Sequence, residues 1–361
     1  MLQSAEDDSG SEEVSLSWPQ VEGPRQLSPE LEQPPDKAVR GALTAVSPLR
    51  WRTVLAVPMA AFVVLAIHFF ILKKEPSIET RSYTLLFGEF IGVSFVLLAL
   101  QPFWAGLRHW MRHMCPIFTG AIFLLGTWDV VTSGLRLLPL PYFPGPAAVL
   151  QSLINDRVLL LDSTWHSLLL LLSGYTLGVI AGLISGICIG WSSPIRYWGM
   201  PVLKVVGPIP ATAWIPLVMV VSPSAIFSAA ALIALAVWFP VTMLTASGIS
   251  NTRASYLDVA RTLGAGRAYL IFRVAIPAAI PNIFIGLFMG LGASFLTLVV
   301  AESVGVKSGL GWYVSWAQGW AEYGKVYAAL IIMAAFFSTI MTLLFKVRDR
   351  VLVWQKGVIK W

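Results

Sequence analysis

Apolar residues are gathered into long runs along most of the chain, with short polar segments between them. A helix needs roughly 20 mostly apolar residues to cross the hydrocarbon core of a membrane. Strands of a membrane barrel would instead alternate in polarity over about 10 residues. The pattern therefore predicts an all-α membrane protein. Its eight candidate spans are Thr53–Leu72, Thr84–Leu107, Met114–Leu135, Ser163–Trp191, Val202–Val221, Ala225–Ser247, Pro277–Ala301 and Val326–Phe345.

Composition changes this picture only at the N-terminus. Of the 361 residues, 57% are hydrophobic and 12% are charged, whereas soluble domains carry about 25% charged residues. Residues 1–50 differ, since they are rich in Ser, Glu, Pro and Gln and hold nine acidic against four basic side chains. Such a segment cannot bury enough apolar surface to offset the entropy of ordering. We expect a disordered cytoplasmic tail, with a regulatory docking segment as the alternative.

The distribution of basic residues predicts the orientation of the spans. With a cytoplasmic N-terminus and eight spans, the inside loops after the tail hold twelve Lys and Arg residues, and the outside loops hold seven. Cytoplasmic loops of membrane proteins carry such an excess. Both termini are therefore expected in the cytoplasm, and the basic residues give no reason to expect a nucleic-acid partner.

One cytoplasmic segment combines charge with two glycines. The stretch from Leu257 to Pro277 reads LDVARTLGAGRAYLIFRVAIP and separates two long runs without any charged residue. Gly264 and Gly266 are expected to break a helix, because glycine adopts left-handed backbone conformations that other residues avoid. The pattern predicts a short helix across the membrane surface, a bend, and a second helix that starts near Arg267.

The short helix before the bend has its own apolar spacing. Leu257, Ala260 and Leu263 recur every three residues and can share one helix face. An element of this kind suits a groove on another protein.

This segment resembles the cytoplasmic loop of permease subunits of binding-protein-dependent ABC importers. The pattern of that loop is Glu-Ala-Ala, three residues, Gly, nine residues, Ile, any residue and Leu-Pro. Here Asp258-Val259-Ala260 stands for Glu-Ala-Ala, Gly264 follows after three residues, and nine more lead to Val-Ala-Ile-Pro ending at Pro277. The resemblance implies a coupling helix that docks into a cleft of an ATP-hydrolysing subunit. Its implied coupling residues are Leu257, Asp258, Ala260, Arg261 and Gly264.

Further segments resemble the family's branch for nitrate, sulfonate, taurine and bicarbonate: FPGPAAVL, STWHSLLLLLSGYTLGVIAGLISGICIG, GPIPATAWIPLV and VVAESVGVKSGLGW. The resemblance runs from about Met114 to the end of the chain. It implies a type I ABC importer permease fold with six core transmembrane helices, preceded here by two extra ones. The expected organisation is a tail at 1–50, an additional transmembrane hairpin at 51–110, and a permease core at 111–361 with the coupling loop at 252–276.

The implied function is ATP-driven import of a small anion across the bacterial inner membrane. The chain has no Gly-x4-Gly-Lys-Ser/Thr sequence to cradle nucleotide phosphates. ATP and Mg are thus expected in a separate partner subunit, and the chain alone is expected to be no enzyme and to need no cofactor. The implied partners are ATP-binding subunits, an extracytoplasmic solute-binding protein, a second permease copy in a homodimer, and the lipid membrane.

Polar residues within the spans mark a candidate path for the cargo. Pro208, Pro210 and Pro216 are expected to interrupt helical hydrogen bonding, and irregular backbone at membrane depth occurs where it lines a cavity or is buried in protein. Each candidate has a structural alternative, because hydroxyls also join helices and a lysine near a helix end can extend to the interface. The candidate path residues are Lys204, Thr212, Trp214, Ser294 and Thr297.

Two acidic residues of the spans need a partner, because charge at mid-helix costs about 2.5–3.5 kcal/mol in the membrane. We expect Asp129 to hydrogen-bond a neighbouring helix or water, with a role along the path as the alternative. Glu302, at the outer end of the seventh span, is expected to fix an external loop, and anion binding is less compatible with its charge. Glycines spaced by four, Gly178–Gly182–Gly186, predict close helix packing, as do Gly286, Gly290 and Gly292.

Two other classes of protein compete with this interpretation. An ion-gradient-driven secondary transporter often carries inverted repeats with paired broken helices, and the two halves of this sequence do not match. An intramembrane enzyme would need a convergent catalytic or metal cluster. The four histidines are scattered without metal-ligand spacing, so no metal site is predicted.

Overall fold

The computed structural model describes residues 51–71, 81–100, 103, 105–135 and 137–354. The predicted tail, residues 1–50, lies outside the described residues. Within the described part, every element of regular secondary structure is helical, which confirms the predicted class. Six of the predicted spans correspond to helices long and apolar enough to cross a membrane. They are α3 (Arg81–Leu100), α4 (Ala105–Asp129) with its π-helical extension η2 (Val130–Gly134), α6 (Arg157–Trp191), α9 (Ala225–Ser250), the continuous helix Arg267–Val304, and α14 (Tyr323–Val351).

The fifth predicted span is not straight, which corrects the single span expected at Val202–Val221. It consists of α7 (Ser193–Val206), followed by the 3-10 turn η3 (Ala211–Trp214) and α8 (Ile215–Val221), and the two parts are bent by 85°. The prolines that were expected to interrupt the helix lie at or beside the break, where they supply no backbone N–H. Gly207 also lies there, and a Cβ on it would overlap the ring of Phe239.

A row of glycines joins α6 to α9, and we call it the glycine seam. Positions four apart lie on one face of a helix, and all five members are buried. A Cβ on any of them would lie 2.6–2.9 Å from atoms of α9. The seam therefore brings the two backbones together along both helices, as predicted from three of its members. It consists of Gly174, Gly178, Gly182, Gly186 and Gly190.

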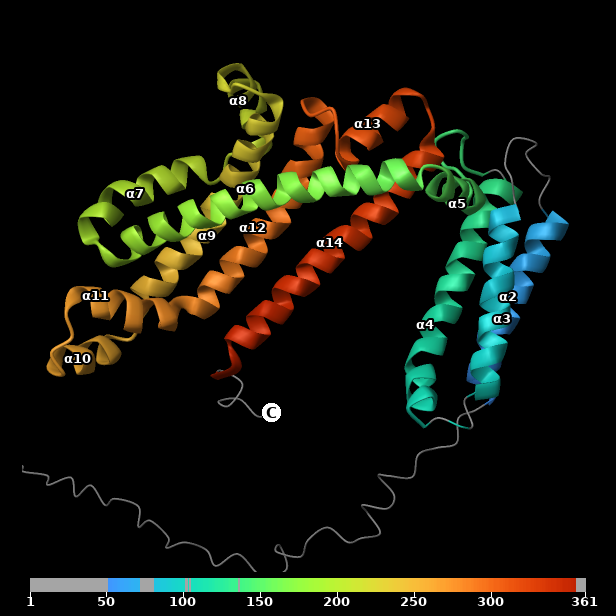
Figure 1. Cartoon of the computed structure of the whole chain (residues 1–361), viewed down its shortest axis with the longest axis horizontal. Coiled ribbons are helices and arrows are strands. Elements are labelled where there is room, and N and C mark those ends of the chain that lie inside the picture. Colours follow the sequence, from blue (N-terminus) through green and yellow to red (C-terminus); the bar gives the residue numbers. More distant parts are fainter. Residues whose placement is uncertain (1–50, 72–80, 101–102, 104, 136, 355–361) are drawn as a thin grey trace, which may run out of the picture. The chain divides into compact units, whose positions relative to one another are not determined.

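The other side of α9 packs on α12 (Ile276–Val304). Gly286 and Gly290 of α12 approach the backbone of α9 closely, whereas Gly292 is exposed and has no atom near the position of a Cβ. Packing was therefore the wrong explanation for Gly292. Between the helices, the α9 side chains Ile233, Val237 and Val241 are fully buried. The helix α9 is thus the centre of the core, with α6 and α12 on two of its sides (Figure 1).

The two extra N-terminal helices, α2 (Trp51–Ile71) and α3, pack with each other, and α2 packs on α4. His68 Nδ1 of α2 lies 2.7 Å from Asp129 Oδ2 of α4, and both side chains are buried. The ring of Tyr83 from α3 stands 4.7 Å from the imidazole. The expected hydrogen bond between Asp129 and a neighbouring helix is therefore confirmed.

Candidate coupling and translocation sites

A helical hairpin connects α9 to α12. The short helix α10 (Ala254–Thr262) follows α9, and α11 (Arg267–Tyr269) starts a helix that continues through the π-helical segment η4 (Leu270–Ala275) into α12. Both α10 and α11 lie beyond the ends of the two long helices (Figure 1). This arrangement matches the predicted hairpin, including the helix start at Arg267.

Gly264 makes the bend of the hairpin. Its φ is +84°, in the left-handed region. The N–H of Gly264 donates to Arg261 O at 2.9 Å, and the N–H of Ala265 donates to Ala260 O at 3.0 Å. These two bonds form a Schellman motif, which satisfies carbonyls left free at a helix end. Gly266 has an extended backbone and starts the second helix, so left-handed geometry is needed at Gly264 alone.

The outer face of the first arm of the hairpin is apolar and consists of Tyr256 and Val259 of α10 with the residue after its end, Leu263, which are 52%, 60% and 82% exposed. Leu257 and Ala260 are half-buried. The expectation that Leu263 shares their face is therefore wrong, because α10 ends at Thr262 and the chain has begun to turn.

Two charged coupling candidates lie on the same helix and pair with each other. Arg261 Nη1 donates to Asp258 Oδ1 at 2.9 Å, and both side chains are more than half exposed. The acidic residue expected to face a partner is thus already engaged by a neighbour, and a partner would meet an ion pair.

A cavity of about 290 Å³ lies between the bent span, α9 and α12. Thr212 of η3 and Thr297 of α12 both line it, so two of the predicted path residues share one cavity. Apolar side chains such as Phe239, Met289 and Leu296 form much of its wall. No Asp, Glu, Lys or Arg lines this cavity.

The other three predicted path residues do not line this cavity. Ser294 is fully buried and donates to Leu291 O of its own helix at 2.6 Å, so it acts within the helix. Lys204 is exposed in the last turn of α7. Trp214 ends η3, two residues beyond Thr212, and its indole N–H is buried without an acceptor among the described residues.

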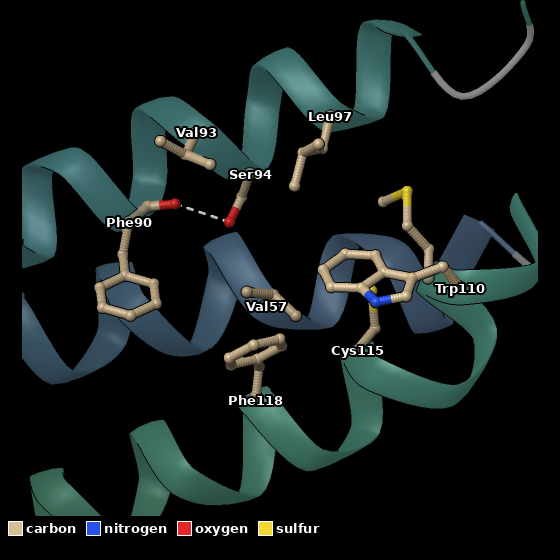
Figure 2. Close-up of a pocket in the computed structure, with 9 residues that line it drawn as sticks. Val57, Phe90, Val93, Ser94, Leu97, Trp110, Cys115 and Phe118 are labelled. Carbon is tan, nitrogen blue, oxygen red and sulfur yellow. Dashed lines mark hydrogen bonds between the residues drawn. The ribbon is translucent and has the colours of Figure 1, made fainter. Parts of the chain in front are cut away.

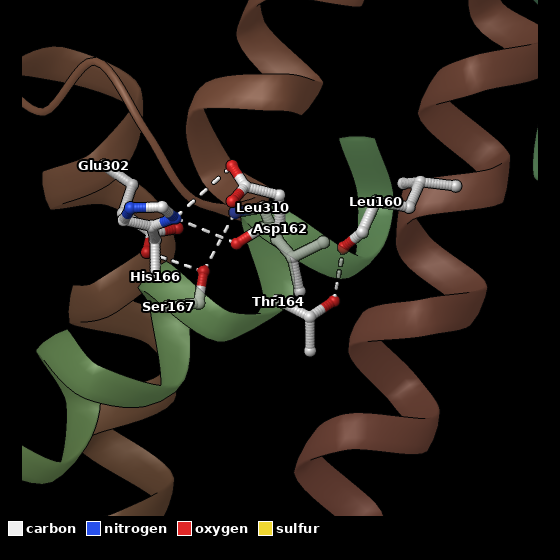
Figure 3. A network of polar contacts seen from close by, with 7 residues as sticks. All are labelled: Leu160, Asp162, Thr164, His166, Ser167, Glu302 and Leu310. Carbon is white, nitrogen blue, oxygen red and sulfur yellow. Dashed lines mark hydrogen bonds and ion pairs between the residues drawn. The ribbon is translucent and has the colours of Figure 1, made fainter. Parts of the chain in front are cut away.

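Glu302 holds the start of α13 (Leu310–Gly319), as expected for a residue that fixes an external loop (Figure 3). Gly311 N–H donates to Glu302 Oε2 at 2.8 Å, and the Ser167 hydroxyl donates to Oε1 at 2.6 Å. Ser167 Oγ in turn accepts the Leu310 N–H at 2.9 Å. The carboxylate therefore serves the free N–H groups of a helix start.

Gly309 explains the Gly-Leu-Gly segment beside this carboxylate. Its φ is +98°, and a Cβ on it would overlap the Glu302 carboxylate. The sequence thus carries a signal for Glu302 and Gly309, whereas nothing in it distinguished Ser167, which comes 135 residues earlier.

A second polar contact ties the start of α6 to α13 and α14. Tyr313 Oη donates to Asp156 Oδ2 at 2.7 Å, and Lys325 Nζ lies 3.4 Å from the same oxygen. Burial, reinforced by the hydrogen bond to Asp156, raises the pKa of the Tyr313 phenol well above its usual range. Tyr313 therefore stays a hydrogen-bond donor at neutral pH.

Another cavity, of about 140 Å³, lies between the extra helices and α4 (Figure 2). Its walls include Val57, Phe90 and Trp110, and the Ser94 hydroxyl donates to Phe90 O at 2.6 Å. The Ser94 hydroxyl is thus already hydrogen-bonded, and the other walls of this cavity are mostly apolar. This cavity is therefore less suited to a polar cargo than the cavity at Thr212. Among the described residues, no group of three His, Cys, Asp or Glu side chains could hold a metal.

Comparison with known proteins identifies the family. The family model for the binding-protein-dependent transport system inner membrane component matches residues 174–352. A probable ABC transporter permease protein of Haemophilus influenzae is 32% identical over 62% of this chain and 91% of its own length. The taurine transport system permease protein TauC of Escherichia coli is 32% identical over 60% and 81%. The bicarbonate transport system permease protein CmpB of Synechococcus elongatus is 28% identical over 71% and 94%. The chain therefore belongs to the permease components of ABC transporters, as a multi-pass membrane protein of the type I permease fold that is not itself catalytic.

Proposed function

We propose that the chain is the permease subunit of an ATP-driven importer that moves a small anion into the cytoplasm. One observation carries the proposal: the coupling hairpin joins α9 to α12, and these same two helices line the cavity at Thr212 and Thr297. A force applied to the hairpin is thus applied to two cavity walls.

The partner at the hairpin is an ATP-binding subunit, which supplies ATP and Mg. Tyr256, Val259 and Leu263 present it with an apolar face, and the Asp258–Arg261 pair and the bend at Gly264 adjoin that face. Half-buried Leu257 and Ala260 support the helix from within. Closure of two ATP-binding subunits would shift the hairpins of two permease copies and exchange inward-open for outward-open states.

The proposed cargo is a small oxyanion or sulfonate of the nitrate, sulfonate, taurine or bicarbonate type. Two relatives are named for taurine and bicarbonate transport. The Thr212 hydroxyl is a neutral hydrogen-bond donor in the cavity, which suits an anion that must also leave, whereas the Thr297 hydroxyl already donates to Ala293 O of its own helix at 3.0 Å. The indole N–H of Trp214 has no acceptor among the described residues but lies outside the lining of this cavity, so it would act beside the path. Lys204 would attract the anion as it leaves, and Ser294 would act only by supporting its helix.

The remaining parts follow from the same proposal. A second permease copy would complete the cavity in a homodimer, since Met289 and Leu296 of its wall are 58% and 69% exposed. A solute-binding protein would deliver cargo on the outer side, and both termini would be cytoplasmic in the bacterial inner membrane. The core would be 111–361, with the coupling loop at 252–276 and the extra hairpin at 51–110.

The hairpin's outer face provides the test. Val259→Asp should abolish co-purification of the ATP-binding subunit with the full-length chain, because it puts a charge into an apolar contact. Val351→Asp is the matched control, since Val351 is exposed at the far end of α14 and outside the hairpin. Normal co-purification of the Val259→Asp variant would contradict the proposed docking face.

A further inference from the structure

The helix that carries the second arm of the hairpin is longer than a membrane is thick. It runs without interruption over 38 residues, Arg267–Val304. At 1.5 Å per residue this is roughly 57 Å, against about 30 Å for the hydrocarbon core. The helix therefore extends beyond the hydrocarbon core, and the arm of the hairpin at its start, Arg267–Arg273, is the part furthest from Val304.

This first part of the helix has two different faces. Leu270 and Ala275 are buried, at 4% and 0% exposure. Tyr269 and Phe272 are 57% and 65% exposed, and Arg273 beside them is exposed as well. Tyr269, Phe272 and Arg273 are spaced by three and four residues, so they share one side of the helix, and Arg267 is exposed at its first residue. We call the exposed residues Arg267, Tyr269, Phe272 and Arg273 the basic-aromatic face.

The two arginines of this face differ from other arginines nearby. Arg261 is paired with Asp258, and the guanidinium of Arg253 lies 5.9 Å from the ring of Tyr256. Arg196 donates to Ile189 O at 3.1 Å, at the end of α6. Among the described residues, Arg267 and Arg273 make no ion pair, hydrogen bond or ring contact, so their guanidinium groups are available.

We infer that the basic-aromatic face binds the headgroup of an anionic phospholipid. A guanidinium group matches the geometry of phosphate and can donate two hydrogen bonds to it. Aromatic side chains are enriched at the membrane interface, where one part of the ring meets apolar chains. Charge complementarity and the exposed aromatic rings of Tyr269 and Phe272 thus select the same partner. The inference does not depend on the direction of transport or on the identity of the cargo.

The lipid surface is separate from the proposed contact with the ATP-binding subunit. The outer face of the first arm precedes the bend at Gly264, and the basic-aromatic face follows it. A bound lipid would therefore hold the second arm at the membrane while α10 remains free. Substitutions can test the two surfaces independently.

Titration of dioleoyl phosphatidylglycerol into the full-length chain in neutral detergent, read by native mass spectrometry, tests the inference. Each basic residue near an anionic surface strengthens binding roughly 5-fold. Arg267→Gln and Arg273→Gln should therefore each weaken the apparent affinity about 5-fold, and the double variant about 25-fold. The double Lys variant should retain most binding, since it keeps the charge. Dioleoyl phosphatidylcholine should bind more weakly than phosphatidylglycerol.

Arg261→Gln is the matched control, because it removes the same charge from the first arm of the hairpin. It should leave phosphatidylglycerol binding unchanged. Equal binding of the two lipids would overturn the inference, as would equal losses in the Arg261 variant and in the Arg267 and Arg273 variants. Displacement of the lipid by glycerol 3-phosphate would also overturn it, since soluble phosphate would then be the ligand.

Discussion

Gly264 determines where the first arm of the coupling hairpin ends and in which direction the chain continues. Its backbone is left-handed, and the position of a Cβ is open to solvent. A side chain there meets no neighbour, so the penalty comes from the backbone alone. For an L-residue this conformation costs about 1–2 kcal/mol.

Gly264→Val should misdirect α10 and reduce binding of the ATP-binding subunit, while the spans still insert. Gly266→Ala is the matched control, since Gly266 is two residues away, has an extended backbone and has equally open surroundings. The measurement is the amount of ATP-binding subunit retained on the tagged chain. Equal retention by the two variants would show that the bend does not position the coupling helix.

Glu302 should control the start of α13. Glu302→Leu removes the acceptor of the Gly311 N–H, and a buried N–H without a partner costs about 1–3 kcal/mol. Hydrogen exchange at Leu310 and Gly311 should therefore become faster. Gly309→Ala should act in the same way, because its Cβ overlaps the carboxylate. Gly319→Ala, in open surroundings at the other end of α13, should leave the exchange unchanged; unchanged exchange in all three variants would contradict this role.

Partners of single residues were the hardest part to predict from the sequence. The cost of a charge in the membrane indicated that Asp129 needs a partner, but His68 is 61 residues away, and no local pattern points to it. Ser167 was missed for the same reason. Leu263 was misplaced because apolar spacing gives a face only while the helix continues, and α10 ends one residue earlier.

The contact between α2 and α4 depends on the buried His68–Asp129 pair. Removal of one partner from a buried ion pair costs about 3–5 kcal/mol of stability, because the remaining side chain is left as an unpaired buried charge. His68→Leu and Asp129→Leu should each lower the thermal midpoint of the chain in detergent, and the double variant should lower it less than the sum. Glu89→Leu, at an exposed carboxylate on α3, should have little effect. Additive losses in the double variant would show that the pair contributes nothing.

The glycine seam sets the distance between α6 and α9. In Gly182→Val, the new side chain would meet Val241, whose Cβ lies 2.8 Å from the position of a Cβ on residue 182. Overpacking of this kind costs about 1–3 kcal/mol. The variant should lose thermal stability in detergent, whereas Gly92→Val on α3 should not, because no atom lies within 4 Å there. An equal midpoint for both variants would contradict close packing along the seam.

The positions of the transmembrane helices along the chain were easier to predict than their bends. Long apolar runs located six of the eight expected spans as continuous membrane-length helices, because the thickness of the membrane sets the length of a helix independently of its neighbours. The first expected span, Thr53–Leu72, corresponds to α2, whose apolar part, Leu55–Phe70, is shorter than a span. Three prolines indicated a break in the fifth span, but the 85° bend between its parts depends on packing against α9 and α12. That bend brings Thr212 and Thr297 into the lining of one cavity.

Across the chain, the hairpin, α9, α12 and the cavity form one connected unit. The hairpin begins where α9 ends and leads into α12, and both helices supply cavity walls at Phe239 and Thr297. A rigid connection of this kind transmits a displacement from one end of the core to its interior. The central claim is that the displacement comes from ATP hydrolysis in a partner subunit.

Uptake of labelled taurine or bicarbonate into proteoliposomes tests this claim most directly. The vesicles would contain the full-length chain with its ATP-binding subunit, with ATP inside and the solute-binding protein outside. Uptake should require both ATP and the binding protein, and it should persist when ion gradients are dissipated. Uptake by the chain alone, driven by an ion gradient without the ATP-binding subunit, would contradict the account and identify a secondary transporter.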